Sequence, residues 1–173
     1  MLITEEYRAL NAALHSTNPE YGTSGHRWAG QIELMAHDIG AKSILDYGAG
    51  KQTLGQALSH MIVAAYDPAI EGLSDRPEPA DFVACTDVLE HIEPNCLDAV
   101  LDDISALANK GVFLTVATRP AKKVLADGRN AHLIQESSDW WLPKLWERWD
   151  IRLFQAKDGE FAMFGRTKLR PMQ

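Results

Sequence analysis

Several residues able to bind a ligand stand directly after short apolar runs of the sequence. Asp46, Gly48 and Gly50 end the first of these runs, in the segment ILDYGAG. Glycines let a backbone and a ligand approach closely, and the start of a following helix offers unpaired N–H groups to an anion. The dinucleotide pattern GxGxxG is absent because Thr53 occupies the position of its last glycine, which argues against NAD and FAD. The segment therefore indicates another ligand, or a turn with a structural role alone.

A second acid, Asp67, ends the next apolar run. It follows Asp46 by about 20 residues, the spacing at which an acid past a glycine turn holds a ribose. One carboxylate can accept hydrogen bonds from two adjacent hydroxyl groups. The alternative is that Asp67 caps the turn that it forms with Pro68.

The segment DVLEH brings together two acids and a histidine. Asp87, Glu90 and His91 stand at positions i, i+3 and i+4, which share one face of a helical turn. Carboxylate oxygens and a neutral imidazole nitrogen suit Mg²⁺, Mn²⁺ or Zn²⁺. His132, in the loop DGRNAH, could reach the same site. The alternatives are that Glu90 and His91 order the loop, that His91 is a lone general base, and that His132 is a solvated loop residue.

A parallel sheet covered by helices would position these residues. Four apolar runs, at 44–45, 61–66, 82–85 and 112–117, are continuous rather than alternating, which indicates strands buried on both faces. Ligands of such sheets bind beyond the carboxyl ends of the strands, where the polar residues above stand. Asp158-Gly159, between the apolar runs 151–155 and 161–164, predicts an antiparallel hairpin after the parallel strands.

Helices are expected before and between the strands. Thr4 can cap a helix that runs to about residue 16, and Gly40 suits the end of a helix over 27–38. An amphipathic helix from residue 97 is closed by Lys110-Gly111, and a helix over 138–149 contains Pro143. The alternation of strands and helices predicts an α/β fold.

The composition narrows the class of protein. The chain has 173 residues, 46% of them hydrophobic, and a net charge of −7, which fits one globular domain with a small ligand better than a nucleic-acid binder. Cys85 and Cys96 are too few for a disulfide framework, and no apolar run approaches the ~20 residues that span a bilayer. Because the start MLITEEYRAL is acidic, we expect no signal peptide and a soluble, cytoplasmic protein.

Four segments between Ser43 and Thr118 point to a family. In order, ILDYGAG, AAYDPAI, DFVACTDVLEHIEP and GVFLTVAT resemble the class I S-adenosylmethionine-dependent methyltransferases, especially the branch with DVLEH or EVLEH after the fourth strand. The C-terminal hairpin is similar to that family's reversed last strand. The resemblance implies a Rossmann-like, mostly parallel sheet with an antiparallel C-terminal hairpin. We expect a single domain over 1–173, with an N-terminal helical cap at 1–40 and the Rossmann-like core at 41–173.

The resemblance also implies roles for the residues at the strand ends. The expected cofactor, S-adenosylmethionine, would have Asp46, Gly48 and Gly50 around its methionine part, Asp67 on its ribose hydroxyl groups, and Thr86 and Asp87 near its sulfonium, with Gln52 and Pro68 completing the set.

The chain departs from the family at two places. Gln52 stands where many members have a third glycine, so the loop has another shape or uses the amide of Gln52. The segment EGLSDRPEPAD is too short and too polar for the helix and third strand that the family has between Asp67 and Asp81. We therefore expect a sheet without a regular third strand, and adenine recognition by backbone groups or by residues adjacent to Asp81.

The DVLEH segment also resembles the metal-dependent 2′-O-methyltransferases of small RNA ends and the O-methyltransferases of ubiquinone synthesis. This resemblance implies that Asp87, Glu90 and His91 bind a divalent ion, with His132 as a fourth ligand, although Asp87 stands where those enzymes have Glu. Without a metal, His91 or His132 would serve as the catalytic base.

The expected function is methylation of a small molecule, with oxygen favoured as the acceptor atom. Arg119, Lys122, Lys123 and Arg129 form a basic cluster that could hold an anionic acceptor, and the same cluster motivates the alternative of a nucleic-acid methyltransferase of the RNA 2′-O type. Gln52 and the shortened middle motivate a second alternative, a catalytically silent cofactor-binding protein. The sequence identifies neither the acceptor nor the oligomeric state.

Overall fold

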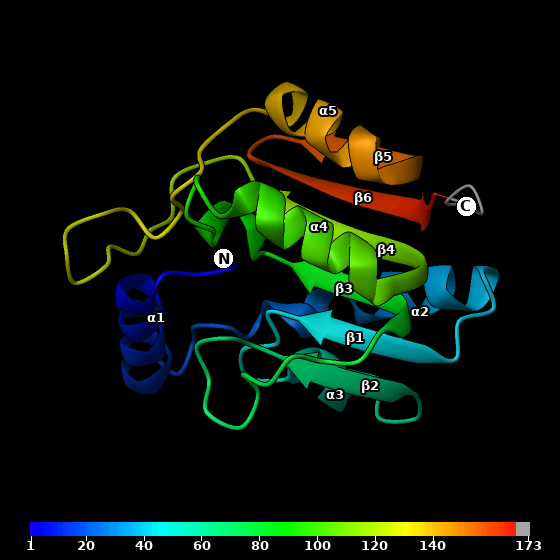
Figure 1. Ribbon diagram of the computed structural model, residues 1–173, viewed down its shortest axis with the longest axis horizontal. Helices are drawn as coiled ribbons and strands as arrows, with labels where there is room; N and C mark the ends of the chain where they lie inside the picture. Colours follow the sequence, from blue (N-terminus) through cyan, green and yellow to red (C-terminus); the bar gives the residue numbers. More distant parts are fainter. Residues whose placement is uncertain (169–173) are drawn as a thin grey trace.

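A six-stranded sheet in the order β2-β1-β3-β4-β6-β5 forms the centre of the computed structural model, which describes residues 1–168 (Figure 1). The parallel strands are β1 (Ser43–Tyr47), β2 (Ile62–Tyr66), β3 (Ala80–Thr86) and β4 (Ala108–Ala117). β5 (Trp149–Lys157) and β6 (Glu160–Thr167) form a hairpin, and β6 runs antiparallel to β4. The α/β fold with a mostly parallel sheet and an antiparallel C-terminal hairpin is therefore confirmed.

The expected hairpin turn is present at Asp158-Gly159. Lys157 pairs with Glu160 across it, and Gly159 has φ +79°, a conformation that glycine adopts without strain. The turn therefore fixes the register of the two last strands, as its sequence predicts.

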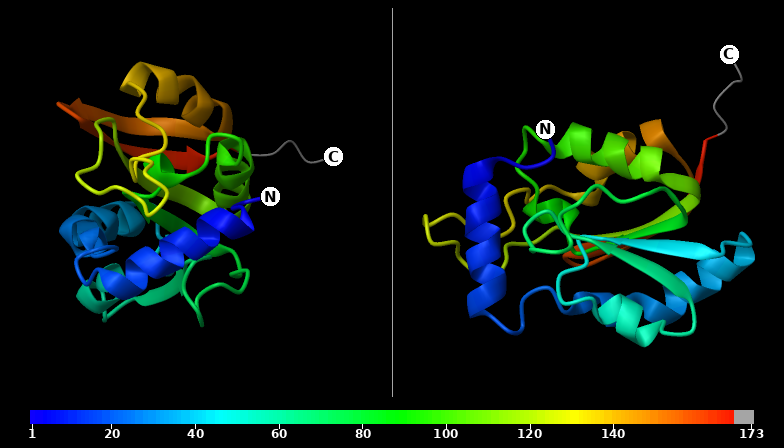
Figure 2. Two further views of the ribbon diagram at one scale, coloured as in Figure 1. Left: turned by 90° about the vertical axis from the view of Figure 1, so that its left-hand side faces the viewer. Right: turned by 60° about the horizontal axis from the view of Figure 1, so that its bottom comes forward.

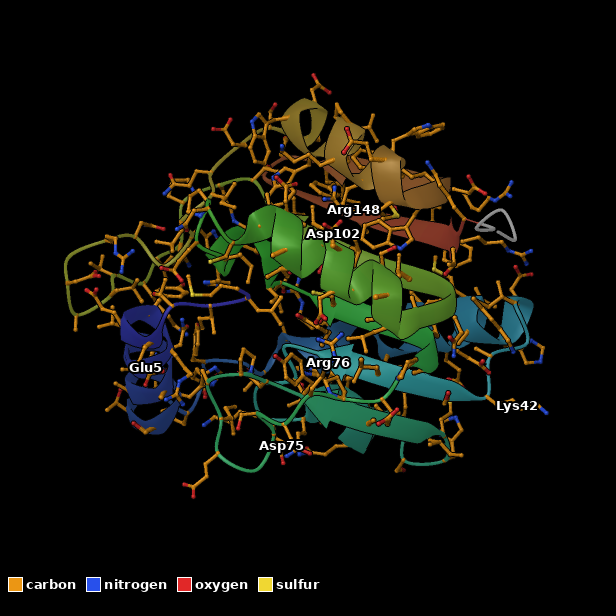
Figure 3. All side chains as sticks on the ribbon, in the orientation of Figure 1. Glu5, Lys42, Asp75, Arg76, Asp102 and Arg148 are labelled. Carbon is orange, nitrogen blue, oxygen red and sulfur yellow. The ribbon has the colours of Figure 1, made fainter. Side chains whose placement is uncertain are left out.

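The segment between β2 and β3 contains no helix and no strand within the described chain, so the expectation of a sheet without a regular third strand is correct. β2 is consequently an edge strand, and Ile62 on it is 71% exposed. Arg76, labelled in Figure 3, joins this segment to the helix Leu97–Leu107 through an ion pair of 2.9 Å with the buried Asp103. Asp103 also accepts a hydrogen bond of 3.0 Å from the hydroxyl of Tyr47.

Helices cover both faces of the sheet (Figures 1 and 2). On one face, α4 (Leu97–Leu107) and α5 (Ser138–Arg148) pack on Leu45, Val83 and Val112. On the other, α2 (Ala29–Asp38) and α3 (Thr53–Ala57) pack on Ile44 and Phe82. Neighbouring residues of β1 and β3 thus enter opposite cores, which explains why these strands are apolar without interruption. The run over β2 is also apolar, but Ile62 and Ala64 on it are exposed, so the expected burial on both faces is wrong for this strand.

Two helix boundaries differ from those expected. Residues Ser24–Trp28 form a separate 3-10 helix, η1, before α2 begins at Ala29. α4 ends at Leu107, and Lys110-Gly111 belong to β4 instead of closing the helix. Gly111 lies so close to β6 that a Cβ on it would stand 2.9 Å from the Gly165 carbonyl oxygen, so pairing with β6 governs this segment.

The first helix, α1 (Glu5–Thr17), lies across the carboxyl ends of the strands (Figure 2, right). Thr4 caps it as expected, because its side chain accepts a hydrogen bond from the Tyr7 N–H. Tyr7 packs on Leu125 and Ala131 of the long connection after β4, in an apolar cluster separate from the two sheet cores. We call α1 and residues 118–133 the roof. α2, by contrast, packs on the sheet, so the first 40 residues contribute to both the roof and the core layer.

None of the described helices has both the length and the apolar character needed to cross a membrane.

Candidate functional site

A cavity of about 360 Å³ lies between the carboxyl ends of β1, β2 and β3 and the roof. This volume is typical of small-ligand sites, which measure about 300–1,000 Å³. Of the eight residues that the sequence predicts to bind the cofactor, six line the cavity: Asp46, Gly48, Asp67, Pro68, Thr86 and Asp87. Gly50 and Gln52 do not line it.

Two acids occupy the ends of neighbouring strands in this cavity. Asp46 is 3% exposed, and its carboxyl group has no hydrogen-bond partner within residues 1–168. Burial, and secondarily the charge of Asp67, raise the pKa of Asp46 to about 7. Asp67 is satisfied in part, because its Oδ2 accepts from the Gly50 N–H at 3.1 Å and its Oδ1 from the Ala69 N–H at 3.0 Å. A carboxylate has further acceptor positions, which a ligand can use.

The glycine turn serves the site mainly through its backbone. Gly48 has φ +81°, and a Cβ on it would collide with the side chain of Val88 on the cavity wall. Gly50 orients its N–H toward Asp67 while its Cα faces Gly22 of the segment after α1. Gln52, at the position of the family's third glycine, has φ +57°, the left-handed conformation that a glycine would favour there. The loop thus keeps a glycine-like backbone with a glutamine in it.

Asp87 takes a different position from the one expected. Only Leu89–His91 form a helical turn, the 3-10 helix η2, and Asp87 precedes it with φ +55°. The Asp87 carboxylate accepts a hydrogen bond of 3.0 Å from the hydroxyl of Thr115 on β4. The structure therefore does not bring Asp87 into one cluster with Glu90 and His91.

Glu90 is fully buried under the cavity floor. Its Oε1 accepts from the Ala117 N–H at 2.9 Å, whereas its Oε2 has no partner within residues 1–168. Burial, followed by the charge of Asp87, raises the pKa of Glu90 to about 8. A buried carboxyl oxygen without a partner is costly, which favours a proton or a bound ion at this position.

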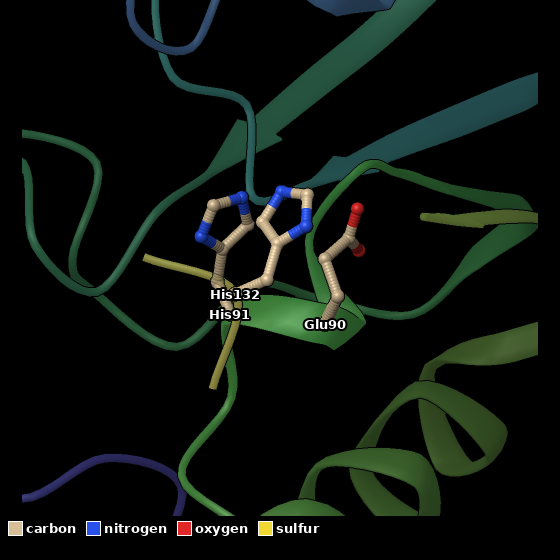
Figure 4. Close-up of side chains that lie close together, drawn as sticks. All are labelled: Glu90, His91 and His132. Carbon is tan, nitrogen blue, oxygen red and sulfur yellow. The ribbon is translucent and has the colours of Figure 1, made fainter. Parts of the chain in front are cut away.

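His91 and His132 meet beside Glu90 (Figure 4). One possible ligand atom from each of the three residues lies within 4.8 Å of the other two. The Nδ1 of His91 donates to the Ala131 carbonyl at 2.7 Å and that of His132 donates to the Arg119 carbonyl at 2.6 Å. Because a carbonyl only accepts, each Nδ1 carries the proton and each Nε2 keeps a lone pair. Burial and the neighbouring His132 lower the pKa of His91 to about 4.

The roof and the segment after α1 bring to the cavity side chains that are not among the predicted cofactor, catalytic or metal-binding residues. His15 lines the cavity with its Nε2 3.9 Å from Asp67 Oδ2, and its Nδ1 is buried without a partner within residues 1–168. Tyr21 packs against His15 on one side and His91 on another, with ring centroids 4.6 and 5.8 Å away. Tyr7 donates to the His91 carbonyl at 2.6 Å. The recurrence of Tyr7, Asn11 and His15 every four residues was the available signal, since it places three polar-tipped side chains on one helix face.

Asp81, next to which the sequence places possible adenine-binding residues, lies away from the cavity. Asp81 stands at the amino end of β3, whereas the cavity lies at the carboxyl ends of the strands. There Asp81 accepts from the Lys42 N–H at 2.8 Å and from Lys110 Nζ at 3.0 Å. Its role is therefore to join the ends of β1, β3 and β4.

No protein-family model and no curated protein matches this chain in sequence. Solved structures do match it in fold, among them a Burkholderia thailandensis 1,6-didemethyltoxoflavin-N1-methyltransferase with bound 1,6-didemethyltoxoflavin and S-adenosylhomocysteine. That match has a TM-score of 0.67 at 16% identity and covers 97% of this chain and 92% of the other. The chain has the fold of the class I S-adenosylmethionine-dependent methyltransferases.

Two further structures extend this likeness of the methyltransferase fold. The magnesium protoporphyrin IX methyltransferase of Synechocystis, with bound S-adenosylmethionine, matches with a TM-score of 0.63 at 12% identity, over 95% of this chain and 99% of the other. The N-methyltransferase NodS of Bradyrhizobium japonicum, in complex with S-adenosylhomocysteine, matches with a TM-score of 0.62 at 13% identity, over 96% and 100%. At these identities the likeness is one of fold.

Proposed function

We propose that the protein transfers a methyl group from S-adenosylmethionine to a small molecule, with oxygen as the favoured acceptor atom. The observation that carries this proposal is the pair Asp46 and Asp67 in one cavity, where the Asp46 carboxyl has no hydrogen-bond partner within residues 1–168. Two neighbouring carboxyl groups in one cavity are suited to a ligand that supplies hydrogen-bond donors to both. The fold of the methyltransferases adds independent support.

The residues present fit this cofactor. Asp46 is suited to the ammonium group of the methionine part, and the free acceptor positions of Asp67 to the two ribose hydroxyl groups. Thr86 and Pro68 also line the cavity. Gly50 and Gln52 would act indirectly, Gly50 by holding Asp67 through its N–H.

The chain's own residues would position the acceptor and remove its proton. S-adenosylmethionine, when bound, supplies an electrophilic methyl group on a sulfonium. Holding two reactants in contact accounts for much of the rate in such reactions. Without a bound metal, His91 would be the favoured proton acceptor, because its Nδ1 donates to the Ala131 carbonyl and leaves the Nε2 lone pair free, with His132 as the second candidate.

We further propose that Glu90, His91 and His132 hold a divalent ion such as Mg²⁺, Mn²⁺ or Zn²⁺. Metal-binding histidines commonly donate their second ring N–H to a backbone carbonyl, as both histidines do here. The buried Oε2 of Glu90, which has no hydrogen-bond partner within residues 1–168, also supports a bound ion at this position. The bond from Thr115 disfavours Asp87 as a further ligand. Such an ion would lower the pKa of an acceptor hydroxyl group.

The finer assignments follow from the same site. The turn over Leu89–His91 supports membership of the DVLEH or EVLEH branch. Lysines on the cavity wall support an anionic acceptor, and the free Cys85 and Cys96 support a cytoplasmic setting.

The experiment is to incubate the protein with methyl-labelled S-adenosylmethionine and, separately, a small-metabolite extract and an RNA extract. We expect label to enter a small molecule and not RNA. Label in RNA, with binding that weakens steeply as salt rises, would establish the nucleic-acid alternative. Binding of S-adenosylhomocysteine without any transfer would favour the catalytically silent protein, and failure to bind it would overturn the proposal.

A further inference from the structure

The four cations of the basic cluster are not equivalent. Arg119 donates to the Gly159 carbonyl at 2.8 Å and lies 3.7 Å from Glu160, and Arg129 is paired with Asp127 at 2.6 Å. Within residues 1–168, no carboxylate forms an ion pair with Lys122 or Lys123, although both line the cavity. Within the described residues, the two lysines are therefore the members of the cluster whose ammonium groups are available to pair with an anionic ligand.

Lys123 is held in a fixed relation to His91. Its Nζ lies 4.8 Å from the centroid of the Tyr21 ring, and the same ring packs perpendicular to the His91 ring at a centroid distance of 5.8 Å. The carbonyl of Lys123 accepts from the Ala131 N–H at 3.0 Å, while the Ala131 carbonyl accepts from His91 Nδ1. Ala131 thus contacts both Lys123 and His91. The Lys123 ammonium and the His91 imidazole both pack against the Tyr21 ring.

The acids Asp46 and Asp67 and the two lysines line different parts of the cavity wall. The acids Asp46 and Asp67 occupy the strand ends, where the cofactor is proposed to bind, and the lysines occupy the roof segment after β4. A positive wall beside the proposed base attracts negative groups and repels positive ones. Tyr21 offers an apolar ring surface between the two positions.

We propose that Lys123, assisted by Lys122, forms an oxyanion subsite that determines acceptor specificity. The acceptor is a small molecule that carries a carboxylate or a phosphate together with a nucleophilic group a few bonds away, so that the anion contacts Lys123 while the nucleophile reaches His91. This inference rests on the proposed methyl transfer and names its substrate class.

The test uses binding of small probes to the full-length protein, measured by calorimetry with and without S-adenosylhomocysteine. The anionic probes are benzoate and phenyl phosphate, and the neutral probe is benzyl alcohol. The variant is Lys123→Met, which removes the charge and keeps the length. Lys144→Met is the matched control, because Lys144 also places its Nζ over an aromatic ring, at 4.6 Å from Trp140, but lies outside the cavity.

We expect Lys123→Met to weaken the anionic probes at least tenfold, Lys144→Met to leave them unchanged, and Lys123→Arg to retain most of the affinity. Stronger binding of phenyl phosphate than of benzoate would assign the subsite to phosphates, and the reverse to carboxylates. Unchanged anion affinity in Lys123→Met, or no binding of either anion by the wild type, would overturn the inference. The S-adenosylhomocysteine titration reports separately on the proposed function, since Lys123→Met should leave it intact.

Discussion

Gly50 lies directly against the backbone of Gly22, so that a Cβ on Gly50 would stand 2.7 Å from the Gly22 Cα. Lys51 strengthens this contact, donating from its N–H to the Gly22 carbonyl at 2.8 Å and from its Nζ to the His15 carbonyl at 2.7 Å. The second glycine of the turn is therefore required for the approach of the N-terminal segment, and it connects the proposed cofactor loop to the roof.

This contact predicts that Gly50→Ala destabilises the protein. A left-handed φ costs a residue with a Cβ about 1–2 kcal/mol, and overpacking adds roughly 1–3 kcal/mol. We expect urea denaturation to show a loss of about 2–5 kcal/mol in the free energy of unfolding. Gly128→Ala is the control, because Gly128 also has a positive φ of +88° but has open space around its Cα. If both variants lost the same free energy of unfolding, the Gly22 contact would have no role.

Asp67→Asn should weaken the binding of S-adenosylhomocysteine. The amide keeps the shape of the side chain but removes a charged acceptor, which is worth about 1–3 kcal/mol. Asp81→Asn makes the same change at the opposite edge of the sheet and should leave the affinity unchanged. Titration calorimetry measures both. Equal affinities for Asp67→Asn and the wild type would reduce Asp67 to a cap of the turn at Ala69.

The raised pKa of Asp46 predicts how stability depends on pH. Because burial favours the protonated form in the folded state, Asp46 contributes stability that is complete below its unfolded pKa near 3.9 and is lost as pH rises through about 7. The wild type should therefore lose on the order of 2 kcal/mol more than Asp46→Asn between pH 5 and pH 8. Glu90 acts in the same direction, since its pKa is raised to about 8. The Asp46→Asn variant should therefore still lose some stability as pH rises.

Urea denaturation at the two pH values, in chelator and without cofactor, measures this difference. Asp75→Asn is the control, because Asp75 is exposed in the segment between β2 and β3. If the wild type and Asp46→Asn lost the same free energy of unfolding between pH 5 and pH 8, the pKa of Asp46 would not be raised in the folded protein.

The sequence predicts those parts of the fold that depend on local pattern. Continuous apolar runs mark strands whose successive residues, such as Ile44 and Leu45, enter different cores. Asp158-Gly159 marks the hairpin, and the polar segment after Asp67 is too short for another strand. These signals succeed because burial on two faces and turn geometry are properties of a few adjacent residues.

What the sequence does not predict depends on contacts between distant segments. The end of α4 is set by pairing of Gly111 with β6, and the roof by packing of Tyr7 on Leu125. Asp87 has a suitable spacing for a ligand cluster, yet its hydrogen bond with Thr115 on β4 directs it elsewhere. The position of His15 in the cavity wall depends on the course of α1 across the strand ends, which no local pattern encodes.

The proposed metal site gives the last prediction. After exhaustive chelation and dialysis, the wild type should bind Mn²⁺ or Zn²⁺, because Glu90, His91 and His132 offer three ligand atoms within 4.8 Å. His132→Ala removes one of them and should weaken binding by roughly 10–100-fold or more, the range seen even for outer-shell changes. Asp87→Asn should have a small effect, since Asp87 lies outside the cluster of the three ligand atoms and its Oδ1 accepts from Thr115.

His26→Ala is the matched control for the metal titration. The His26 Nδ1 also contacts a backbone carbonyl, that of Thr23 at 2.7 Å, but His26 is exposed and lies outside the cluster, so its loss should not change metal affinity. Once an acceptor is known, activity should fall in chelator and return with the ion. Full activity in chelator would instead leave His91 as the base, and because its pKa is lowered to about 4, activity would then persist well below pH 6.5, where an unperturbed histidine becomes protonated. The pH profile in chelator therefore separates a metal-assisted reaction from one that relies on the buried imidazole.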